Sequence, residues 1–410
     1  MDVKEVKRLL LYLLLSMLSG TVAAQTFSAK VVDARTGQPL PFASVYGGPG
    51  IATITNAEGE FSVSCDSATM LRISYVSYRQ QTLRAGQMPA RIGLATMDIE
   101  LQEVTVMPIA PLIRKVTKET LRQLQKNRKK KANFFYRQTS FQDSTCYEFA
   151  EAFITGRSAV WLRELNLTNG RYAAIKSDST QQYSYYNNFY TNSEIEIASG
   201  SKDYPKDNAL MPLARFYKYF YDVDYEVIRD DSTRLFAIHF KPKRHVRRNI
   251  LDVTIYVDEQ TLHLRKLEGV SRNQVILHTE GAIGKNKLKR WLIPSECAFI
   301  VNMTEERGFL EVQSVFASEC HQLGEKFVET RSILYNVGDN YMPPGESGKE
   351  KKKKKEKGQQ MEFYGNLHNT ITEQGYDHRF WRNNPVVLRT PLEQQVMELF
   401  ERDNLFGLFR

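Results

Sequence analysis

Short stretches in which apolar and polar residues alternate most constrain the fold of this 410-residue chain. The alternation is clean at residues 235–240, 253–257 and 262–266, and turn residues separate the stretches. A period of two is typical of strands that bury one face. In residues 26–102 the stretches recur about every ten residues, a spacing that favours a β-sandwich.

Two segments break this strand pattern and predict helices. Residues 112–131 place Leu and Val at helical spacing and end in a basic run, which complements the carboxyl end of a helix dipole. Thr390 and Glu393 form a capping box with Pro391 at the first helical position, so we predict a helix over 391–402. A helix followed by a long antiparallel meander indicates an α+β domain.

The net charge of +9 at pH 7 is concentrated in two runs. Residues 126–131 carry five basic side chains, and residues 345–360 carry seven Lys and three Glu, so the rest of the chain is electrically balanced. A nucleic-acid-binding surface spreads its charge over a folded face, so we expect no nucleic-acid partner. Residues 343–361 cannot bury themselves and are predicted to form a disordered loop.

The first 24 residues resemble a secretory signal peptide. Lys4, Lys7 and Arg8 precede an apolar stretch at residues 9–18, and Ala24 ends a small-residue cleavage site. An uncleaved amino-terminal anchor is the alternative. No later stretch is long and apolar enough for a transmembrane helix, so we expect an exported protein in the periplasm or on the periplasmic face of the outer membrane.

Four cysteines follow this leader. They are Cys65, Cys146, Cys297 and Cys320. An even number in an exported chain permits disulfides, and buried free thiols are the alternative. If the turn of a hairpin lies near residues 305–307, Cys297 lies opposite about residue 314 and the last two cysteines do not face each other.

Three motifs in the amino-terminal region, at residues 31–45, 53–61 and 71–78, carry a family resemblance. Together they resemble the carboxypeptidase-D regulatory-like domain, a seven-stranded transthyretin-like sandwich common in exported proteins of Bacteroidota. Ser77 stands where this family usually has Gly. The resemblance is to the accessory sandwich of metallocarboxypeptidases, so it implies no peptidase activity. Residues 99–106 are similar to a Ton-box-like strand, although a last sandwich strand with a connector is favoured.

A looser resemblance covers the second domain. Residues 135–139, 149–154, 237–268 and 290–296 resemble uncharacterised envelope proteins of Bacteroidota that carry a domain of unknown function. The hairpin at 253–266 is also similar to half-barrel lipoprotein carriers of the LolA/LolB type. The predicted fold class is β-rich: an Ig/transthyretin-like sandwich, then an α+β domain dominated by a large antiparallel, half-barrel-like sheet.

The predicted organisation has six parts. They are the signal peptide at 1–24, the sandwich at 25–107, a connecting helix at 108–131, the antiparallel β-rich domain at 132–342, the disordered loop at 343–361 and a carboxyl-terminal segment at 362–410 with its helix at 391–402.

Two groups of residues are candidates for binding. Aromatic rings stack on sugars, so an aromatic and amide tract is a candidate glycan contact: Tyr183, Tyr185, Tyr186 and Tyr190. The basic run is a candidate contact for an anionic surface: Lys126, Arg128, Lys129, Lys130 and Lys131. A packed aromatic core and a solvated helix end are the structural alternatives.

No catalytic motif emerges from the sequence. None of the seven His lies in HExxH, and no nucleophile elbow or phosphate-binding loop is present, so we predict no cofactor and no metal. We expect a non-enzymatic envelope protein that docks an envelope or outer-membrane protein, or a lipid or glycan. The alternatives are a periplasmic lipid or lipoprotein carrier and a hydrolase with a scattered active site.

Overall fold

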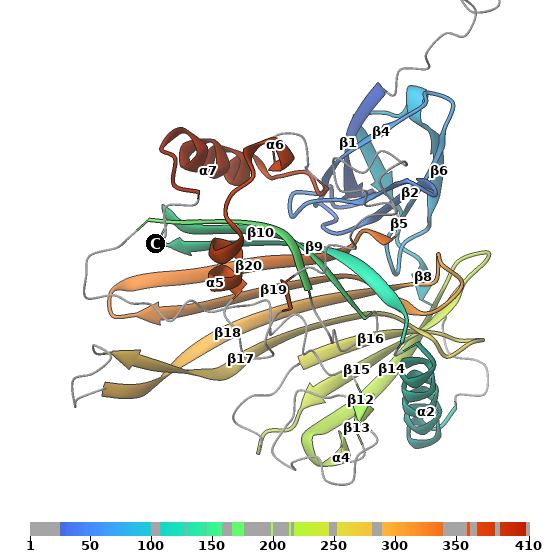
Figure 1. Cartoon of the computed structure of the whole chain (residues 1–410). Helices are drawn as coiled ribbons and strands as arrows, with labels where there is room; N and C mark the ends of the chain where they lie inside the picture. Colours follow the sequence, from blue (N-terminus) through green and yellow to red (C-terminus); the bar gives the residue numbers. More distant parts are fainter. Residues whose placement is uncertain are drawn as a thin grey trace, which may run out of the picture.

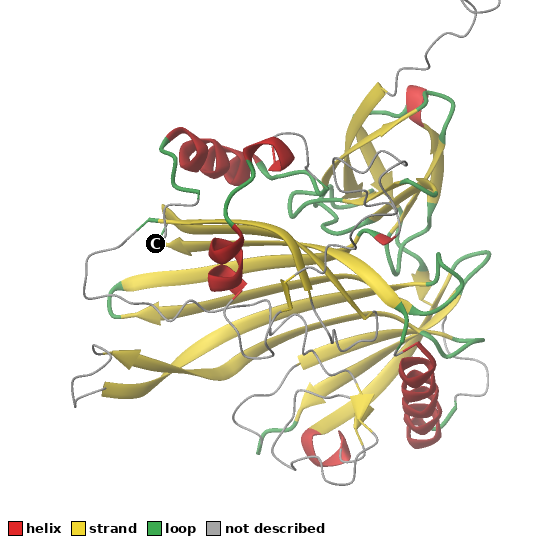
Figure 2. Cartoon of the chain, viewed as in Figure 1, coloured by secondary structure: helices red, strands yellow, loops and turns green. Residues whose placement is uncertain are grey.

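The computed structural model describes residues 25–99, 107–127, 129–143, 145–157, 166–175, 198–199, 213–214, 217–245, 252–280, 289–338, 359–360, 367–381 and 386–406. A small sandwich of strands stands on one face of a large curved sheet, and helices lie on both faces of that sheet (Figures 1 and 2). No described helix is long and apolar enough to cross a membrane. The predicted signal peptide lies outside the described residues.

Seven strands form the sandwich. One sheet contains β4 (Glu60–Cys65), β1 (Gln25–Asp33) and β7 (Arg91–Leu94), and the other contains β3 (Ile51–Ile54), β2 (Ser44–Gly48), β5 (Met70–Ser74) and β6 (Gln81–Arg84), which is followed by the short 3-10 helix η1 (Ala85–Gln87). Their inward side chains, among them Val31, Phe61 and Leu71, are fully buried. The predicted seven-stranded sandwich is confirmed.

Two of the positions in the sandwich with a left-handed backbone show why glycine is favoured there. Gly59 has φ +77°, and a Cβ there would lie 2.5 Å from the carbonyl oxygen of Val31, so the turn needs a glycine. Ser77 also has a positive φ, 72°, which is strained for a residue with a Cβ. The family's usual glycine at this position therefore has a conformational reason, and the serine keeps the same turn at a cost.

Twelve strands form the large sheet, and every neighbouring pair is antiparallel. In spatial order they are β21 (Gln359–Gln360), β11 (Asn166–Ala174), β10 (Thr145–Arg157), β9 (Lys131–Gln142), β20 (Lys326–Asn336), β19 (Glu311–Leu323), β18 (Lys289–Thr304), β17 (Leu264–Glu280), β16 (Asp252–Asp258), β15 (Arg234–Pro242), β14 (Tyr221–Arg229) and β8 (Asp98–Ile99). Eleven of them come after residue 107 in the chain, as the predicted fold class requires.

One face of this sheet is largely apolar. The amphipathic helix α2 (Ile109–Asn127) buries Leu112, Ile113 and Val116 there, near the short elements β12 (Ala198–Ser199), β13 (Leu213–Ala214) and α4 (Tyr217–Phe220). Helix α5 (Leu367–Gln374) packs on β11, where Gly170 leaves room for Ile371: a Cβ would lie 2.5 Å from that side chain. Hydrophobic burial therefore holds these elements.

The opposite face carries the sandwich and the carboxyl-terminal helices α6 (His378–Trp381) and α7 (Pro391–Arg402). The capping box predicted at the start of α7 is present: the Thr390 hydroxyl accepts from the Glu393 amide, and the Glu393 carboxylate accepts from the Thr390 amide. Phe380 and Trp381 pack with Phe153 of β10. The capping box therefore fixes where α7 begins, and the aromatic contacts attach α6 to the sheet.

Three boundaries differ from the sequence-based expectation. Helix α2 ends at Asn127 rather than 131, because Lys131 already pairs with Arg157 in the β9–β10 ladder. Gln359–Gln360 pairs with β11, although it falls in the predicted disordered loop. Asp98–Ile99 pairs with β14 of the large sheet and is not a sandwich strand; residues 100–106 lie outside the described residues.

The register of the β18–β19 hairpin also differs from the expectation. This register decides whether Cys297 and Cys320 face each other. Cys297 lies opposite Glu319 rather than residue 314, because the turn is longer than expected and a bulge follows Asn302. Cys320 lies opposite Glu296, and successive residues of a strand face opposite sides, so the two thiols point away from each other. All four cysteines are free.

Candidate functional site

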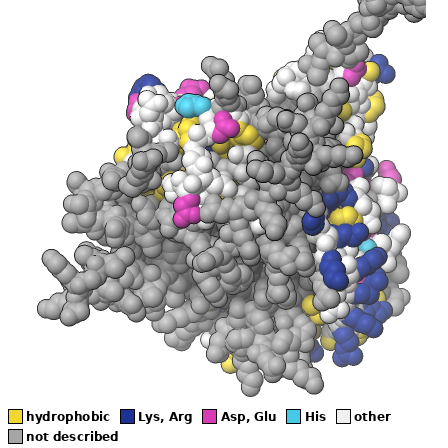
Figure 3. Space-filling model, viewed as in Figure 1, with side chains coloured by type: hydrophobic (Ala, Val, Ile, Leu, Met, Phe, Trp, Pro, Cys, Tyr) yellow, Lys and Arg dark blue, Asp and Glu magenta, His cyan; other side chains and the backbone are white. Residues whose placement is uncertain are grey.

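The predicted binding residues fall in two different situations. Tyr183, Tyr185, Tyr186, Tyr190 and Arg128 lie outside the described residues. The other basic residues are exposed: Lys126 is in the last turn of α2, Lys129 and Lys130 follow it, and Lys131 begins β9. Figure 3 shows Lys and Arg side chains gathered over this part of the molecule.

The sandwich is fixed to the large sheet by a small set of contacts. The Phe42 ring stacks on Phe316 of β19, with 4.7 Å between ring centroids. The Gln313 amide donates to the Ser44 hydroxyl at 2.8 Å. An ion pair between Arg72 of β5 and Glu306 adds a charged contact at the end of the β18–β19 hairpin. These contacts join residues more than 200 positions apart in the chain.

A cleft of about 490 Å³ opens beside these contacts. The segment that follows β5 supplies one wall, with Tyr75, Ser77 and Tyr78. The opposite wall comes from strands β15 to β19 of the large sheet and from the β14–β15 and β18–β19 turns. Its polar residues are Asp230, Thr233, Asp258, Arg265, Asn302, Thr304, Glu305, Glu306 and Gln313. The cleft exists only where the two domains meet.

Carboxylates dominate the charge of this cleft. Four lining residues are carboxylates, Asp230, Asp258, Glu305 and Glu306, and one is a cation, Arg265; Glu306 is also paired with Arg72 at the edge of the cleft. Burial raises the pKa of Asp230, but hydrogen bonds from the Ser232 and Thr233 amides outweigh it, so the pKa is lowered. The pKa of Asp258 is lowered in the same way, against burial, by the Thr261 amide and hydroxyl and by Arg265. Both side chains are therefore fixed negative charges at neutral pH.

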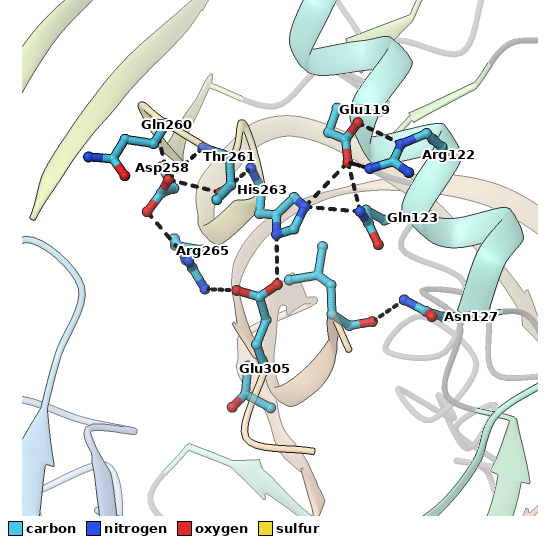
Figure 4. Close-up of polar contacts among 12 residues, drawn as sticks. Glu119, Arg122, Gln123, Asn127, Asp258, Gln260, Thr261, His263, Arg265 and Glu305 are labelled. Carbon is cyan, nitrogen blue, oxygen red and sulfur yellow. Dashed lines mark hydrogen bonds and ion pairs between the residues drawn. The ribbon is translucent and has the colours of Figure 1, made fainter. Parts of the chain in front are cut away.

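A polar network holds the cleft's acidic wall in place (Figure 4). Nδ1 of His263 lies 2.6 Å from Glu305, and the other oxygen of Glu305 accepts from Arg265 at 2.6 Å. On the far side of the ring, the Gln123 amide of α2 lies 2.9 Å from Nε2, and Glu119 lies 3.3 Å from it. The network therefore links α2 to the wall of the cleft.

Glu119 is the charged anchor of this network on α2. Hydrogen bonds from Arg122 are the largest influence on it, and with the Gln123 amide they lower its pKa to about 2 against the effect of burial. The carboxylate is thus ionised at any physiological pH. Because it holds the Gln123 amide at 2.7 Å, it also orients the group that contacts His263.

A buried lysine stabilises the tyrosine wall. Lys266 of β17 is 2% exposed; its ammonium lies 3.2 Å from the Tyr75 hydroxyl, 4.4 Å from the centre of that ring and 2.6 Å from Glu268. Burial works against its charge, yet Tyr75 and Glu268 outweigh that effect and raise its pKa. Tyr78 in turn donates to Asp33 of β1 at 2.9 Å. The hydroxyls of both rings are therefore fixed by contacts with Lys266 and Asp33.

The lining of the cleft suits recognition by fixed charge. A general acid needs a carboxyl with a raised pKa, whereas Asp230 and Asp258 have lowered ones. Within the described ranges, no three His, Cys, Asp or Glu side chains are arranged to hold a metal ion. The wall combines negative charge with amides, hydroxyls and tyrosine rings, which suits a cationic or hydrogen-bonding ligand.

Sequence reasoning did not find this cleft. Asp230 belongs to an Asp-Asp pair in turn-like sequence, a pattern that solvation alone explains, and Glu305 lies in the predicted hairpin turn. His263 lies at the start of a predicted strand. The available signal was that carboxylates recur in successive turns of the meander, because turns at one edge of a sheet meet in space.

Comparisons with known proteins agree with the first domain. Residues 27–106 match the family model of the CarboxypepD_reg-like domain. The amino-terminal sandwich thus has both the strands and the sequence pattern of that class of domain. No curated protein matches the chain. Among solved structures, a LolA superfamily protein from Nitrosomonas europaea aligns at 9% identity with a TM-score of 0.20, over 54% of this chain and 93% of that one.

Proposed function

We propose that this chain is a non-enzymatic docking protein of the cell envelope, and that its acidic cleft receives a cationic segment of an envelope partner protein. The observation that carries the proposal is the cleft between the sandwich and the large sheet, whose lining has four carboxylates and one arginine, with Arg72 paired to one of the carboxylates. Negative walls attract and orient positively charged ligands.

The cleft is preorganised for this task. Asp230 and Asp258 are held by backbone amides, and Glu305 is held between His263 and Arg265, so these charges need no rearrangement when a ligand arrives. Rigid groups lose little entropy on binding. The tyrosine wall adds the Tyr78 ring, whose face attracts a cation, whereas Lys266 already lies over the Tyr75 ring.

The family resemblance supports the envelope location. The CarboxypepD_reg-like match covers the sandwich, and the resemblance implies an accessory domain of exported proteins rather than a catalytic one. In this proposal the sandwich is one wall of the binding site. The second domain supplies the charges, so both domains are needed for binding.

Fluorescence anisotropy with labelled peptides tests the proposal. The probes are extended Gly-Lys and Gly-Glu repeats of equal length, and chito-oligosaccharides serve as competitors. We expect the Lys peptide to bind and the Glu peptide not to bind. Asp230→Asn keeps an oxygen for the turn but removes the charge, so it is expected to weaken Lys-peptide binding about threefold.

The matched control is Glu325→Gln, which removes an exposed carboxylate from the β19–β20 turn, outside the cleft lining. It is expected to leave binding unchanged. Equal binding of the two peptides, equal losses for the two variants, or displacement of the Lys peptide by chito-oligosaccharide would contradict a site for cationic polypeptide.

A further inference from the structure

The exposed side of α2 is almost uniformly basic. Five of its residues are exposed cations, and three more follow directly after the helix: Arg114, Lys115, Lys118, Arg122, Lys126, Lys129, Lys130 and Lys131. The single acid of the helix, Glu119, is half-buried and paired with Arg122. The basic run noted in the sequence is thus the end of a longer surface, here called the α2 basic face (Figure 3).

The spacing of four of these cations places them next to one another along the helix. Arg114, Lys118, Arg122 and Lys126 follow each other at intervals of four residues, so they lie in one row along a helix of 19 residues. At 1.5 Å per residue the row from Arg114 to Lys126 extends over about 18 Å. Such a row can contact a flat charged surface along its whole length.

Three of these cations have no ion-pair partner among the described residues. Across the part of the chain that the structure describes, the side chains of Lys115, Lys118 and Lys126 form no ion pair. Protein surfaces usually mix charges of both signs, and a row of one sign that the protein leaves unpaired is a feature of surfaces that bind an oppositely charged partner.

The packing of α2 on the large sheet decides which of its side chains can contact a membrane. Its apolar side chains Leu112, Ile113 and Val116 are buried against the large sheet, so they are not free to enter a bilayer. Gln123 and Asn127 also anchor the helix, through His263 and the Leu310 carbonyl. Any contact with a membrane is therefore electrostatic and superficial.

We propose that the α2 basic face docks on the anionic phosphates of lipid headgroups and so holds the protein against a membrane surface. The choice of lipid over nucleic acid rests on the envelope location in the proposed function, whereas the basic face itself is independent of the cleft. An anionic leaflet attracts Lys and Arg strongly near its surface, and added salt screens that attraction.

Vesicle co-sedimentation of residues 25–410 tests this proposal, since that span holds every described element without the apolar leader. The vesicles are pure phosphatidylcholine, or phosphatidylcholine with roughly one third phosphatidylglycerol. We expect binding to the anionic vesicles only, with a steep decrease as salt is added. The triple variant Lys115→Gln, Lys118→Gln, Lys126→Gln is expected to lower the partition coefficient at least about tenfold.

The matched control removes three exposed cations from the sandwich: Arg35→Gln, Arg84→Gln and Arg91→Gln. It is expected to change partitioning less than about twofold. Thermal melts check that both variants fold. Equal losses for the two triples, or no binding to anionic vesicles, would overturn the proposal.

Two further measurements distinguish this proposal from the proposed function of the cleft. Tighter binding to a short DNA duplex than to anionic vesicles would overturn lipid as the partner. The α2 triple variant is expected to bind the Gly-Lys peptide as the unaltered chain does. If Asp230→Asn loses peptide binding and keeps vesicle binding, the result concerns the cleft and not the α2 basic face.

Discussion

Two glutamates on strand β10 show how differently the two faces of the large sheet are built. Glu148 and Glu151 are both buried, with 3% and 0% exposure, but they lie on opposite faces. On the α2 face, burial raises the pKa of Glu148, which accepts from Ser140, Gln138 and Tyr172. These three partners are neutral, so they only partly compensate the loss of water.

On the α7 face, Glu151 has charged partners. Burial opposes its ionisation, but Arg171, Arg389 and Arg137 outweigh that effect and hold its pKa well below the ordinary range. Their nitrogens lie 2.5, 3.0 and 2.7 Å from its oxygens. Burial alone therefore does not decide the charge of a carboxyl; the groups brought to it by other parts of the chain do.

Breaking this cluster is the largest expected effect. Glu151→Gln leaves three arginines near a neutral amide in a buried site, so we expect unfolding free energy to fall by about 3–5 kcal/mol. Glu148→Gln is the matched variant, on the same strand and equally buried, and we expect a loss of about 1 kcal/mol because its partners are neutral. Urea denaturation measures both, and equal losses would contradict the contrast between the faces.

The pH dependence of stability should also separate the two faces. Burial raises the pKa of Glu319, on the α2 face, to about 7, against an ordinary value of 4.5. Because its folded pKa is the higher one, ionisation opposes folding, and stability falls as pH rises from 4.5 to about 7. Glu151 has the opposite sign: its contribution is complete at neutral pH and is lost as pH falls below its ordinary range.

Glu319→Gln sharpens this point. It is expected to flatten the decline between pH 5 and pH 7 and to raise stability by about 1–2 kcal/mol at pH 8, because a neutral amide has no charge to bury. The control is Glu325→Gln, an exposed carboxylate in the next turn, which should leave the pH profile unchanged. If stability still declines between pH 5 and pH 7 in Glu319→Gln, another group causes the decline.

The smallest effect concerns the helix that covers the charged face. Thr390→Ala removes the hydroxyl that caps α7, so we expect a loss of about 1 kcal/mol, measured by thermal melting. The capping partner Glu393 also lies 3.4 Å from Arg137, so the cap positions part of the cluster. Thr117→Ala, within α2, is the control and should cost nothing, because Ala is the better helix former. A cost for Thr117→Ala as large as that for Thr390→Ala would show that the cap has no special role.

Local patterns were sufficient to predict much of the fold. Alternating residues marked the strands, three motifs marked the sandwich, and Thr390 with Glu393 marked the start of α7. The hairpin register was wrong by five residues, since Cys297 faces Glu319 rather than residue 314. Turn length and a bulge set the register, and neither has a strong sequence signal there.

The candidate sites were harder to predict, for a different reason. The basic run was visible because its residues are contiguous, although the row from Arg114 to Lys126 needed the helix to be recognised as one exposed face. The cleft combines Tyr75, Asp230 and Glu305, which are separated by up to 230 positions. Side chains that meet only through packing leave no local pattern.

The sequence by itself determined what depends on neighbours along the chain: strand periodicity, helix caps, the basic run and the sandwich motifs. Only the tertiary structure decided which carboxyls are charged, where the cysteines point and that two domains enclose an acidic cleft. The physical reason is that ionisation and binding depend on distances between groups in space. Glu148 and Glu151 have the same side chain three residues apart, and the sheet alone gives them different surroundings.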